Sequence, residues 1–236
     1  MTGVLLAGGL GTRLYPVTRV INKHTLLVWD KPMFFHPFET LVKSGIKRVA
    51  IVSGPPFGHQ IKQFISHLPK KEGLVVTFIN QPRPAGMSDG VSRCAKWVGK
   101  DSVMAIAGDN YYEDDFLPEV KNFSGGALSF LRKVSDPQRY GVPLYKNGKL
   151  VAIKEKPKYP KTNWVVSGPH FFDHQVFSLI RKIKPSARGE LEITDLNTEY
   201  IKLGQFRLIK KTGWWSDMGT FESLMSTSRF IQKKSL

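Results

Sequence analysis

The sequence predicts an α/β fold in which a mostly parallel, mixed sheet is flanked by helices. Short and nearly continuous apolar runs alternate with amphipathic segments along the first half of the chain. This strand-helix-strand repetition is typical of a Rossmann-like sheet with right-handed crossovers. A glycine-rich loop follows the first apolar run, at the end of a strand where such sheets bind their ligands.

The first half of the chain carries the clearest strand and helix signals. Buried strands are expected at 3–7, 48–53, 74–79 and 102–108, which are rich in Val, Ile and other apolar residues. Amphipathic helices are expected between them, at 33–44, 57–67 and 87–98. The apolar segment Met33–Phe38 is expected to be buried or to form a contact in a homo-oligomer.

The pattern changes after about residue 125. Strands are expected at 126–134, 142–157 and 164–173, with a hairpin turn at Asn147-Gly148. Helices are expected at 174–183 and 190–203, and a strand at 205–210. Because we find no repeat and no long linker, we expect a single domain over 1–236. Residues 1–125 would form its nucleotide-binding half, and residues 126–236 would complete the site.

Composition excludes several classes of protein. No apolar run approaches the ~18 residues that span a membrane, and the N-terminus does not resemble a signal peptide. The single cysteine, Cys94, allows no intrachain disulfide, which fits a cytoplasmic protein. The formal net charge is +16, yet the basic residues are scattered, so the sequence does not favour nucleic-acid binding. A basic surface that attracts anionic small molecules is the better interpretation.

Residues 8–11 contain three glycines, and Arg13 follows shortly after them. The dinucleotide fingerprint G-x-G-x-x-G is not met, because Leu14 stands where the last glycine belongs. The P-loop pattern is not met either, because Thr12-Arg13 follows Gly11. We interpret the loop as one whose amides face phosphate oxygens, with Arg13 as a forked cation. A tight turn with a surface arginine is the alternative.

Eight blocks of sequence together resemble one known family. They are LAGGLGTRLYP (6–16), NKHTLLVWDKPM (22–33), QPRPAG (81–86), AGDN (107–110), DPQRYGV (136–142), KEKPKYPKTNWVVSG (154–168), PSARGELEITDLN (185–197) and WWSDMGT (214–220). In this order they resemble the sugar-1-phosphate nucleotidyltransferases. The resemblance is strongest to the short form of the thymidylyltransferases that act on glucose 1-phosphate, and it covers the whole chain.

The resemblance implies a nucleotidyltransferase fold, an activity and a metal. A sugar 1-phosphate, expected to be glucose 1-phosphate, would take a nucleotidyl group from dTTP and release pyrophosphate. A phosphate monoester is largely dianionic at neutral pH, so the reaction needs cations and a hard metal rather than a general base. The implied metal is Mg²⁺, held by Asp109 and Asp217.

The resemblance also implies roles for further residues. The implied catalytic residues are Arg13, Lys23, Asp109, Lys156 and Asp217. The implied nucleotide-binding residues are Leu6, Ala7, Gly8, Gly9, Gly11, Thr12, Arg13, Gln81, Pro84, Gly86 and Asp109. The implied sugar-phosphate-binding residues are Asn110, Tyr140, Gly141, Glu155, Lys156, Val166 and Arg188.

The chain departs from the family pattern at several positions. Leu27 stands where the family has a proline, His170 where it favours tyrosine, and Asp89 where it has an amide. None of these departures removes a proposed metal ligand or phosphate cation. A carboxylate at Asp89 near the sugar would favour an amino sugar, which is one alternative substrate.

Other functions stay open on the sequence alone. A UTP-using enzyme is close to a dTTP-using one, because thymine and uracil share a pairing edge and differ by one methyl group. A non-catalytic nucleotide-sugar-binding subunit would use the same fold, although Arg13, Asp109 and Asp217 are all present. The positive charge alone motivates the nucleic-acid-binding alternative.

Overall fold

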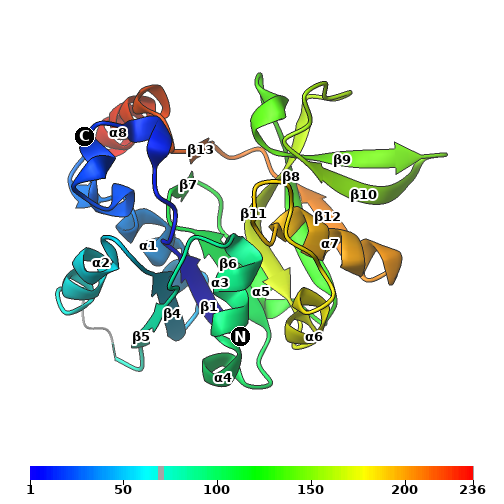
Figure 1. Ribbon diagram of the computed structural model, residues 1–236, viewed down its shortest axis with the longest axis horizontal. Coiled ribbons are helices and arrows are strands. Elements are labelled where there is room, and N and C mark those ends of the chain that lie inside the picture. Colours follow the sequence, from blue (N-terminus) through cyan, green and yellow to red (C-terminus); the bar gives the residue numbers. More distant parts are fainter. Residues whose placement is uncertain (69–71, 236) are drawn as a thin grey trace. The chain divides into compact units, whose positions relative to one another are not determined.

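The computed structural model describes residues 1–68 and 72–235, and Figure 1 shows its ribbon. Residue contacts divide the chain into two compact units. The glycine-loop unit comprises residues 2–84, 106–122 and 213–236, and the hairpin unit comprises Met1, 85–105 and 123–212. These units do not follow a division at residue 125, because 85–105 and 213–236 join the other part of the chain. The single domain stays a prediction.

The glycine-loop unit is built on parallel strands. Strand β1 (Thr2–Leu6) pairs with β4 (Arg48–Ser53), and β4 pairs with β5 (Val75–Asn80), both in parallel. Helices α1 (Phe35–Lys43) and α2 (Gly58–Ile65) lie between them in the chain. These strands and helices match the expected ones. The strand β5 is less buried than predicted, because among the described residues it pairs with β4 only and therefore forms an edge.

Several short elements of this unit were not predicted. Short 3₁₀ helices lie at Thr12–Leu14, Val17–Arg19 and Lys23–Thr25, and β2 (Leu27–Val28) pairs with β3 (Lys31–Pro32). Strand β7 (Asn110–Tyr112) pairs in antiparallel fashion with β13 (Trp215–Asp217), and α5 spans Leu117–Lys121. The helix α8 (Phe221–Ser235) ends the described chain.

Helix α8 packs against the N-terminal segments of the same unit (Figure 1). The backbone amide of Trp29 donates to Ser228 Oγ at 2.7 Å, and Leu224 and Ile231 pack on a core of Val28, Met33 and Met218. Met33 and Phe34 are fully buried, so the apolar segment 33–38 is explained by the core. Helix α8 is thereby fixed against residues 28–33.

The hairpin unit contains mostly antiparallel strands, four α-helices and a 3₁₀ turn. Strands β8 (Ala127–Lys133), β9 (Gly141–Lys146) and β6 (Val103–Ala107, through its first residues) all pair antiparallel with β11 (Trp164–Phe172). Strand β12 (Phe206–Lys210) pairs in parallel with β8. The other elements are α3 (Met87–Arg93), α4 (Ala95–Val98), a 3₁₀ turn (Pro137–Arg139), α6 (Val176–Ile180) and α7 (Ile193–Lys202).

The predicted hairpin is confirmed and two predicted helices are shorter than expected. Strands β9 and β10 (Lys149–Glu155) join through Asn147 and Gly148, whose φ angles of 51° and 74° suit a two-residue turn. The single helix predicted at 87–98 is wrong, because the chain breaks at Cys94 into α3 and α4. Only Val176–Ile180 is α-helical within the predicted segment 174–183.

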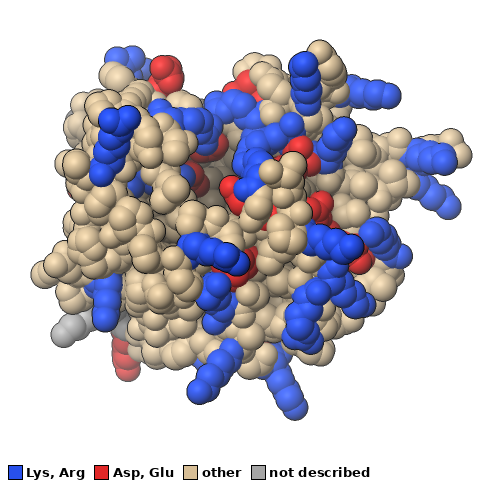
Figure 2. Space-filling model, in the orientation of Figure 1, with Lys and Arg blue, Asp and Glu red and all other residues tan. Residues whose placement is uncertain are grey.

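The class of fold is as predicted: an α/β protein whose mixed sheet strands are accompanied by helices. Every helix in the described ranges is too short or too polar to cross a lipid bilayer. Figure 2 shows Lys and Arg side chains spread over the visible face rather than gathered in one block. That distribution is what the sequence indicates for a basic surface without a dedicated nucleic-acid site.

Candidate active site

The loop after β1 presents unbonded backbone amides. Within the described part of the chain, no hydrogen bond is found for the backbone amides of residues 8–12. The loop is anchored on both sides of this stretch. Ser53 Oγ donates to the Ala7 carbonyl at 2.7 Å, and Thr18 Oγ1 donates to the Gly11 carbonyl at 2.7 Å. Amides that stay exposed in a fixed loop can bind phosphate oxygens.

Glycine is required in this loop because side chains pack directly against it. A Cβ atom on Gly9 would lie 3.1 Å from Lys23 Cε, and one on Gly11 would lie 2.8 Å from Lys23 Cβ. Gly11 also has a φ of 67°, which L-residues with side chains rarely adopt. A Cβ on Gly8 would overlap Gln81 Oε1. The loop therefore curls around Lys23 and touches Gln81.

Lys23 and Asp109 form a buried ion pair. Lys23 Nζ lies 2.5 Å from Asp109 Oδ2, and the two side chains are 10% and 14% exposed. Burial alone would raise the pKa of Asp109. The positive charge of Lys23 and the hydrogen bonds from Lys23 and Asn110 outweigh burial and hold that pKa well below its usual range. Asp109 is therefore a carboxylate at every pH at which the protein would work.

The segment before Lys23 is rigidly held. The side chain of Asn22 caps the 3₁₀ helix by accepting from the His24 amide at 3.0 Å, and it contacts His24 Nδ1 at 2.8 Å. The Asn22 amide donates to Gln60 Oε1 at 2.7 Å. Burial and the Lys23 charge lower the pKa of His24 to about 3, so His24 is neutral and does not compete with Lys23 as a cation.

Asp217 is brought to Asp109 by strand pairing. Asp217 lies opposite Asn110 in the β7–β13 ladder, and the Met218 amide donates to the Asp109 carbonyl at 2.8 Å. Arg13 Nη2 donates to Asp217 Oδ2 at 3.4 Å. The Gly219 amide donates to Asp217 Oδ1 at 2.9 Å. The β7–β13 pairing thus brings together two carboxylates far apart in sequence: Asp109 directly precedes β7, and Asp217 ends β13. Each has a cation beside it.

This donor set suits a hard divalent cation. Mg²⁺ binds oxygen ligands and commonly takes one or two protein carboxylates, with phosphate oxygens and water completing its shell. Asp109 and Asp217 supply carboxylate oxygens directly before β7 and at the end of β13, and their present partners, Lys23 and Arg13, are cations that phosphates could attract. Among the described residues, no group of three or more His, Cys, Asp or Glu forms an all-protein metal site. The residues therefore fit a Mg²⁺ ion that arrives with its substrate.

Gln81, predicted to recognise the base, is buried at the end of β5. The backbone amide of Gln81 donates to the Ser53 carbonyl at 2.8 Å. The carbonyl oxygen of Gln81 lies so close to Gly54 that a Cβ on Gly54 would collide with it. Pro84 is exposed three residues later. Leu6 and Ala7 are buried through their side chains, so only their backbone can face a ligand.

A second cluster of predicted residues lies in the hairpin unit and is centred on Arg188. Its Nη2 lies 2.9 Å from Glu192 Oε2, 3.3 Å from Glu190 Oε2 and 3.6 Å from Glu155 Oε1. Lys156 Nζ pairs with Glu155 at 3.2 Å. Because carboxylates already surround the guanidinium, the contact of Arg188 with a sugar phosphate stays a prediction.

Lys156 has an unusual backbone. Its φ is 39°, and its amide donates to the Tyr140 carbonyl at 3.0 Å. A left-handed conformation in a lysine costs free energy and is typical of functional sites.

Gly141 follows Tyr140 and pairs with Val166. The Val166 side chain packs in the core with Leu131 and Ile153. Val166 can therefore meet a ligand only through its backbone.

Gly86 and Asp89 have contacts that the sequence did not predict. A Cβ on Gly86 would lie 2.5 Å from the Leu191 carbonyl oxygen, so the close approach that this glycine permits is to the loop before α7. Both carboxylate oxygens of Asp89 accept from Arg93, at 2.8 and 3.1 Å. The Asp89 carboxylate therefore pairs with a cation four residues along the chain, and the amino-sugar alternative stays a prediction.

The two units divide the predicted site residues between them. The glycine-loop unit holds Leu6, Ala7, Gly8, Gly9, Gly11, Thr12, Arg13, Lys23, Gln81, Pro84, Asp109, Asn110 and Asp217. The hairpin unit holds Gly86, Tyr140, Gly141, Glu155, Lys156, Val166 and Arg188. Both proposed metal ligands, the glycine loop and two of the phosphate cations are thus gathered in one unit.

Sequence reasoning missed the residues that support Lys23 and Asp109. Asn22 could have been found, because an asparagine directly before a short helical turn is a typical cap. Trp215 donates through Nε1 to Asn110 Oδ1 at 2.8 Å. That bond joins residues more than a hundred positions apart, and nothing in the local pattern signals it.

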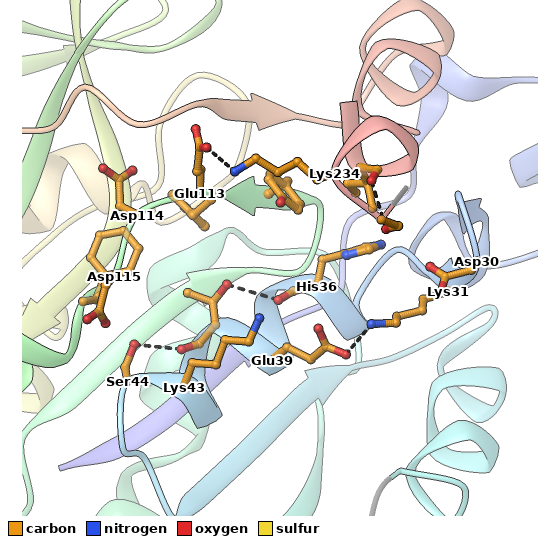
Figure 3. A pocket seen from close by; sticks show the side chains of 16 residues that line it. Asp30, Lys31, His36, Glu39, Lys43, Ser44, Glu113, Asp114, Asp115 and Lys234 are labelled. Atoms are coloured by element: carbon orange, nitrogen blue, oxygen red, sulfur yellow. Dashed lines mark hydrogen bonds and ion pairs between the residues drawn. The ribbon is translucent and has the colours of Figure 1, made fainter. Parts of the chain in front are cut away.

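Two cavities open in the glycine-loop unit. The larger, of about 550 Å³, lies among α1, β7 and α8 (Figure 3). There Lys31 pairs with Glu39 at 2.8 Å, Lys234 pairs with Glu113, and Lys43 points into the space. Its lining includes no predicted site residue. The smaller, of about 160 Å³, lies beside the loop and is lined by Gly8, Gly9, Tyr15, Arg19 and Asn22 among others.

Comparisons with known proteins give the same result along the whole chain. Glucose-1-phosphate thymidylyltransferase of Neisseria meningitidis is 36% identical over 98% of this chain and 83% of its own length. The enzyme of that name from Mycobacterium tuberculosis is 37% identical over 98% of this chain and 82% of its own.

Solved structures agree. A crystal structure from Bacillus anthracis, assigned as a glucose-1-phosphate thymidylyltransferase and bound to sucrose, matches with a TM-score of 0.88 and 39% identity, over 98% of this chain and 94% of that one. A UDP-glucose pyrophosphorylase complexed with UDP-glucose matches with a TM-score of 0.86 at 20% identity, over 99% and 98%, which shows the fold alone. The model of the nucleotidyl transferase family matches residues 2–234. The predicted enzyme class is confirmed, and the chain belongs to the nucleotidyl transferase family.

Proposed function

We propose that the protein transfers the thymidylyl group of dTTP to a sugar 1-phosphate, with glucose 1-phosphate as the expected acceptor. An oxygen of the sugar phosphate forms a bond to the α-phosphorus of the nucleotide. The bond from that phosphorus to the bridging oxygen breaks, and pyrophosphate leaves with the electron pair. The products are a dTDP-sugar and pyrophosphate. No proton needs to be removed, because the attacking phosphate is already largely dianionic near pH 7.

One observation carries the proposal. The unbonded amides of residues 8–12, the cations Arg13 and Lys23, and the carboxylates Asp109 and Asp217 are assembled in a single unit. Such an arrangement can bind a triphosphate, neutralise charge as pyrophosphate leaves, and hold a divalent ion. A non-catalytic nucleotide-sugar-binding subunit would not need this complete set.

The residues have distinct proposed tasks. Asp109 and Asp217 would hold Mg²⁺, which supplies charge neutralisation for the phosphates when bound. The loop amides and Arg13 bind the triphosphate, and Lys23 moves from Asp109 toward the developing charge. The amide of Gln81 offers a donor and an acceptor to the pairing edge of thymine or uracil.

The hairpin unit would bind the sugar. Lys156 meets the sugar phosphate, since its side chain is 44% exposed and its ammonium pairs with the neighbouring Glu155 at 3.2 Å. Glu155 accepts hydrogen bonds from sugar hydroxyls. Two relatives are named glucose-1-phosphate thymidylyltransferase. That name supports the choice of dTTP and glucose 1-phosphate as the substrates.

The experiment is a matrix of substrates. Pyrophosphate release is measured with Mg²⁺ for dTTP, UTP, ATP, GTP and CTP against glucose, galactose and glucosamine 1-phosphates. We expect the highest kcat/KM for dTTP with glucose 1-phosphate, and no release when the sugar phosphate is omitted. Higher turnover with UTP would change the nucleotide but not the reaction. No release from any pair, together with tight and salt-sensitive oligonucleotide binding, would overturn the proposal.

A further inference from the structure

We propose that Asn110 is a positioning residue for Asp109, and that Trp215 and Tyr112 fix its orientation. The three side chains and Asp109 form a continuous chain of hydrogen bonds inside the glycine-loop unit. Asn110 is 8% exposed, so its amide is almost entirely removed from solvent. This role differs from the sugar contact predicted for Asn110, and it rests on the proposed function only where turnover is measured.

The orientation of the Asn110 amide is determined by its neighbours. Trp215 Nε1 lies 2.8 Å from Asn110 Oδ1, and Tyr112 Oη lies 3.1 Å from the same atom. An indole N–H can only donate a hydrogen bond, so the atom that it meets must be the amide oxygen. The NH₂ group of Asn110 must therefore point the other way.

That NH₂ group meets Asp109. Asn110 Nδ2 donates to Asp109 Oδ1 at 3.0 Å, while Lys23 Nζ contacts Asp109 Oδ2 at 2.5 Å. Asn110 thus holds Oδ1 of Asp109, and Oδ2 of the same carboxylate faces the Lys23 ammonium. A rotation of the Asn110 amide would place its oxygen against Asp109 and repel it. Trp215 prevents this rotation, because its N–H would then face an NH₂ group.

The strand pairing explains why these groups meet. Trp215 lies opposite Tyr112, and Asp217 lies opposite Asn110, in the antiparallel β7–β13 ladder. The same pairing that brings Trp215 to Asn110 therefore brings Asp217 beside Asp109. Outer hydrogen bonds of this kind orient the ligands of metal sites, and their loss typically costs 10–100-fold in affinity or activity.

The neighbouring tryptophan provides a matched control. Trp214 stacks on Phe230 with ring centroids 4.1 Å apart and planes at 11°, and its ring also contacts Tyr111. No hydrogen bond of its indole N–H is found within the described ranges. Replacing either tryptophan with phenylalanine keeps an aromatic ring, but only at Trp215 is a bond to the Asn110 amide lost.

The kinetic test compares Trp215→Phe with Trp214→Phe in the full chain. We expect Trp215→Phe to lower kcat for pyrophosphate release by about 10–100-fold, with little change in KM for dTTP. Trp214→Phe should keep kcat near that of the wild type. Thermal unfolding of both variants reports whether either has lost its fold. Equal kcat values for the two variants, whether high or low, would overturn the proposal.

A spectroscopic test needs neither substrate nor metal. In protein labelled with ¹⁵N at the indole nitrogens, the Trp215 signal is identified by its absence in Trp215→Phe. We expect slow solvent exchange for this N–H, and a changed shift with faster exchange in Asn110→Ala, while the Trp214 signal stays in place. If Asn110→Ala leaves the Trp215 signal unchanged, the proposed relay of hydrogen bonds from Trp215 through Asn110 to Asp109 does not exist. This readout stands even if the wild type releases no pyrophosphate.

A double-mutant cycle completes the test. If Trp215 acts through Asn110, Asn110→Ala with Trp215→Phe should lose no more activity than Asn110→Ala alone. Losses that multiply would show independent roles and contradict the relay. Should Trp215→Phe fail to fold, Tyr112→Phe removes one hydroxyl from the same amide oxygen, and the cycle of Tyr112→Phe with Asn110→Ala decides by the same criterion.

Discussion

Lys23 Nζ lies 2.5 Å from Asp109 Oδ2, and both side chains are almost entirely buried. The Lys23 side chain packs against the glycine loop: a Cβ on Gly9 would lie 3.2 Å from its Nζ, and one on Gly11 would lie 3.1 Å from its Cδ. Lys23, proposed to neutralise phosphates, therefore lies beside Asp109, the carboxylate proposed to hold the metal. The pair is satisfied without substrate, so the free protein carries no unpaired charge at this point.

Breaking this pair should separate stability from activity. Lys23→Met leaves the Asp109 carboxylate buried without its cation, and we expect a loss of about 3–5 kcal/mol in the free energy of unfolding. Asp109→Asn should cost less, because the amide oxygen can still accept a hydrogen bond from Lys23 and leaves the ammonium a polar partner. Both variants should lose most of their turnover. Urea unfolding and pyrophosphate release measure the two effects, and a Lys23→Met protein as stable as the wild type would refute the account of the pair.

Arg13 should not be replaceable by lysine. Its guanidinium reaches Asp217 Oδ2 at 3.4 Å, and its fork can contact two oxygens at once. We expect Arg13→Lys to lower kcat/KM by about tenfold or more, since a point charge cannot reproduce that geometry. Thermal unfolding should be unchanged, because the side chain is half exposed. Steady-state kinetics with the wild-type value would leave Arg13 as a surface arginine.

Gly8→Ala should weaken nucleotide binding through Gln81. The added methyl group would overlap Gln81 Oε1, which displaces the amide proposed to read the base. We expect KM for dTTP to rise by roughly tenfold, the cost of about one good hydrogen bond, with a smaller change in kcat. The control is Gly8→Ala combined with Gln81→Ala, which relieves the overlap. The double variant should bind dTTP no differently from Gln81→Ala alone. If Gly8→Ala binds dTTP like the wild type, the proposed contact is wrong.

His170 should make the protein acid-sensitive. Burial lowers the pKa of His170 to about 4, from about 6.5 in an unfolded chain, and its Nδ1 contacts Ser129 Oγ at 2.7 Å. The neutral ring is favoured in the folded state, so its contribution is complete above pH 6.5. As the pH falls from about 6.5 to 4, the unfolded state gains the proton first, and stability of up to about 3 kcal/mol is lost.

The measurement is urea unfolding between pH 7 and pH 4 for the wild type and His170→Asn. The asparagine does not titrate, so the wild type should lose more stability than the variant over this range. All other groups are common to both proteins and cancel in the difference. Parallel curves would show that His170 does not titrate differently in the folded and unfolded states.

Local sequence patterns predicted the strands well, because burial of a strand is the reason that its sequence is apolar. Residues 49–52 are all apolar because β4 is paired on both sides and buried, and the strand has the predicted bounds, 48–53. Strand β5 has the same composition but lies at an edge, and composition does not report a missing neighbour. The break at Cys94 was also missed, because its residues are compatible with a continuous helix.

The site was predictable where it depends on chain-local chemistry. Glycines at 8, 9 and 11 predicted a close approach of the backbone to phosphates, which stays a prediction. The structure shows Lys23 and Gln81 packed against these glycines. The pairs Arg188–Glu192 and Asp89–Arg93 were missed although each joins residues four positions apart, a spacing at which charged side chains commonly pair. The contact of Arg188 with Glu155 could not be predicted, because it depends on tertiary structure. Helix α8 carries an apolar pattern at Leu224 and Ile231 that would have identified it.

The most direct test of the account is a Mg²⁺ titration of pyrophosphate release from dTTP and glucose 1-phosphate. The wild type should be inactive in EDTA and recover fully with excess Mg²⁺. Asp109→Asn and Asp217→Asn should each lose activity by on the order of a hundredfold or more, because several kcal/mol of charge stabilisation depend on their carboxylates. A full rate in EDTA, or wild-type rates in both variants, would contradict the claim that these two residues join the phosphates through a shared cation.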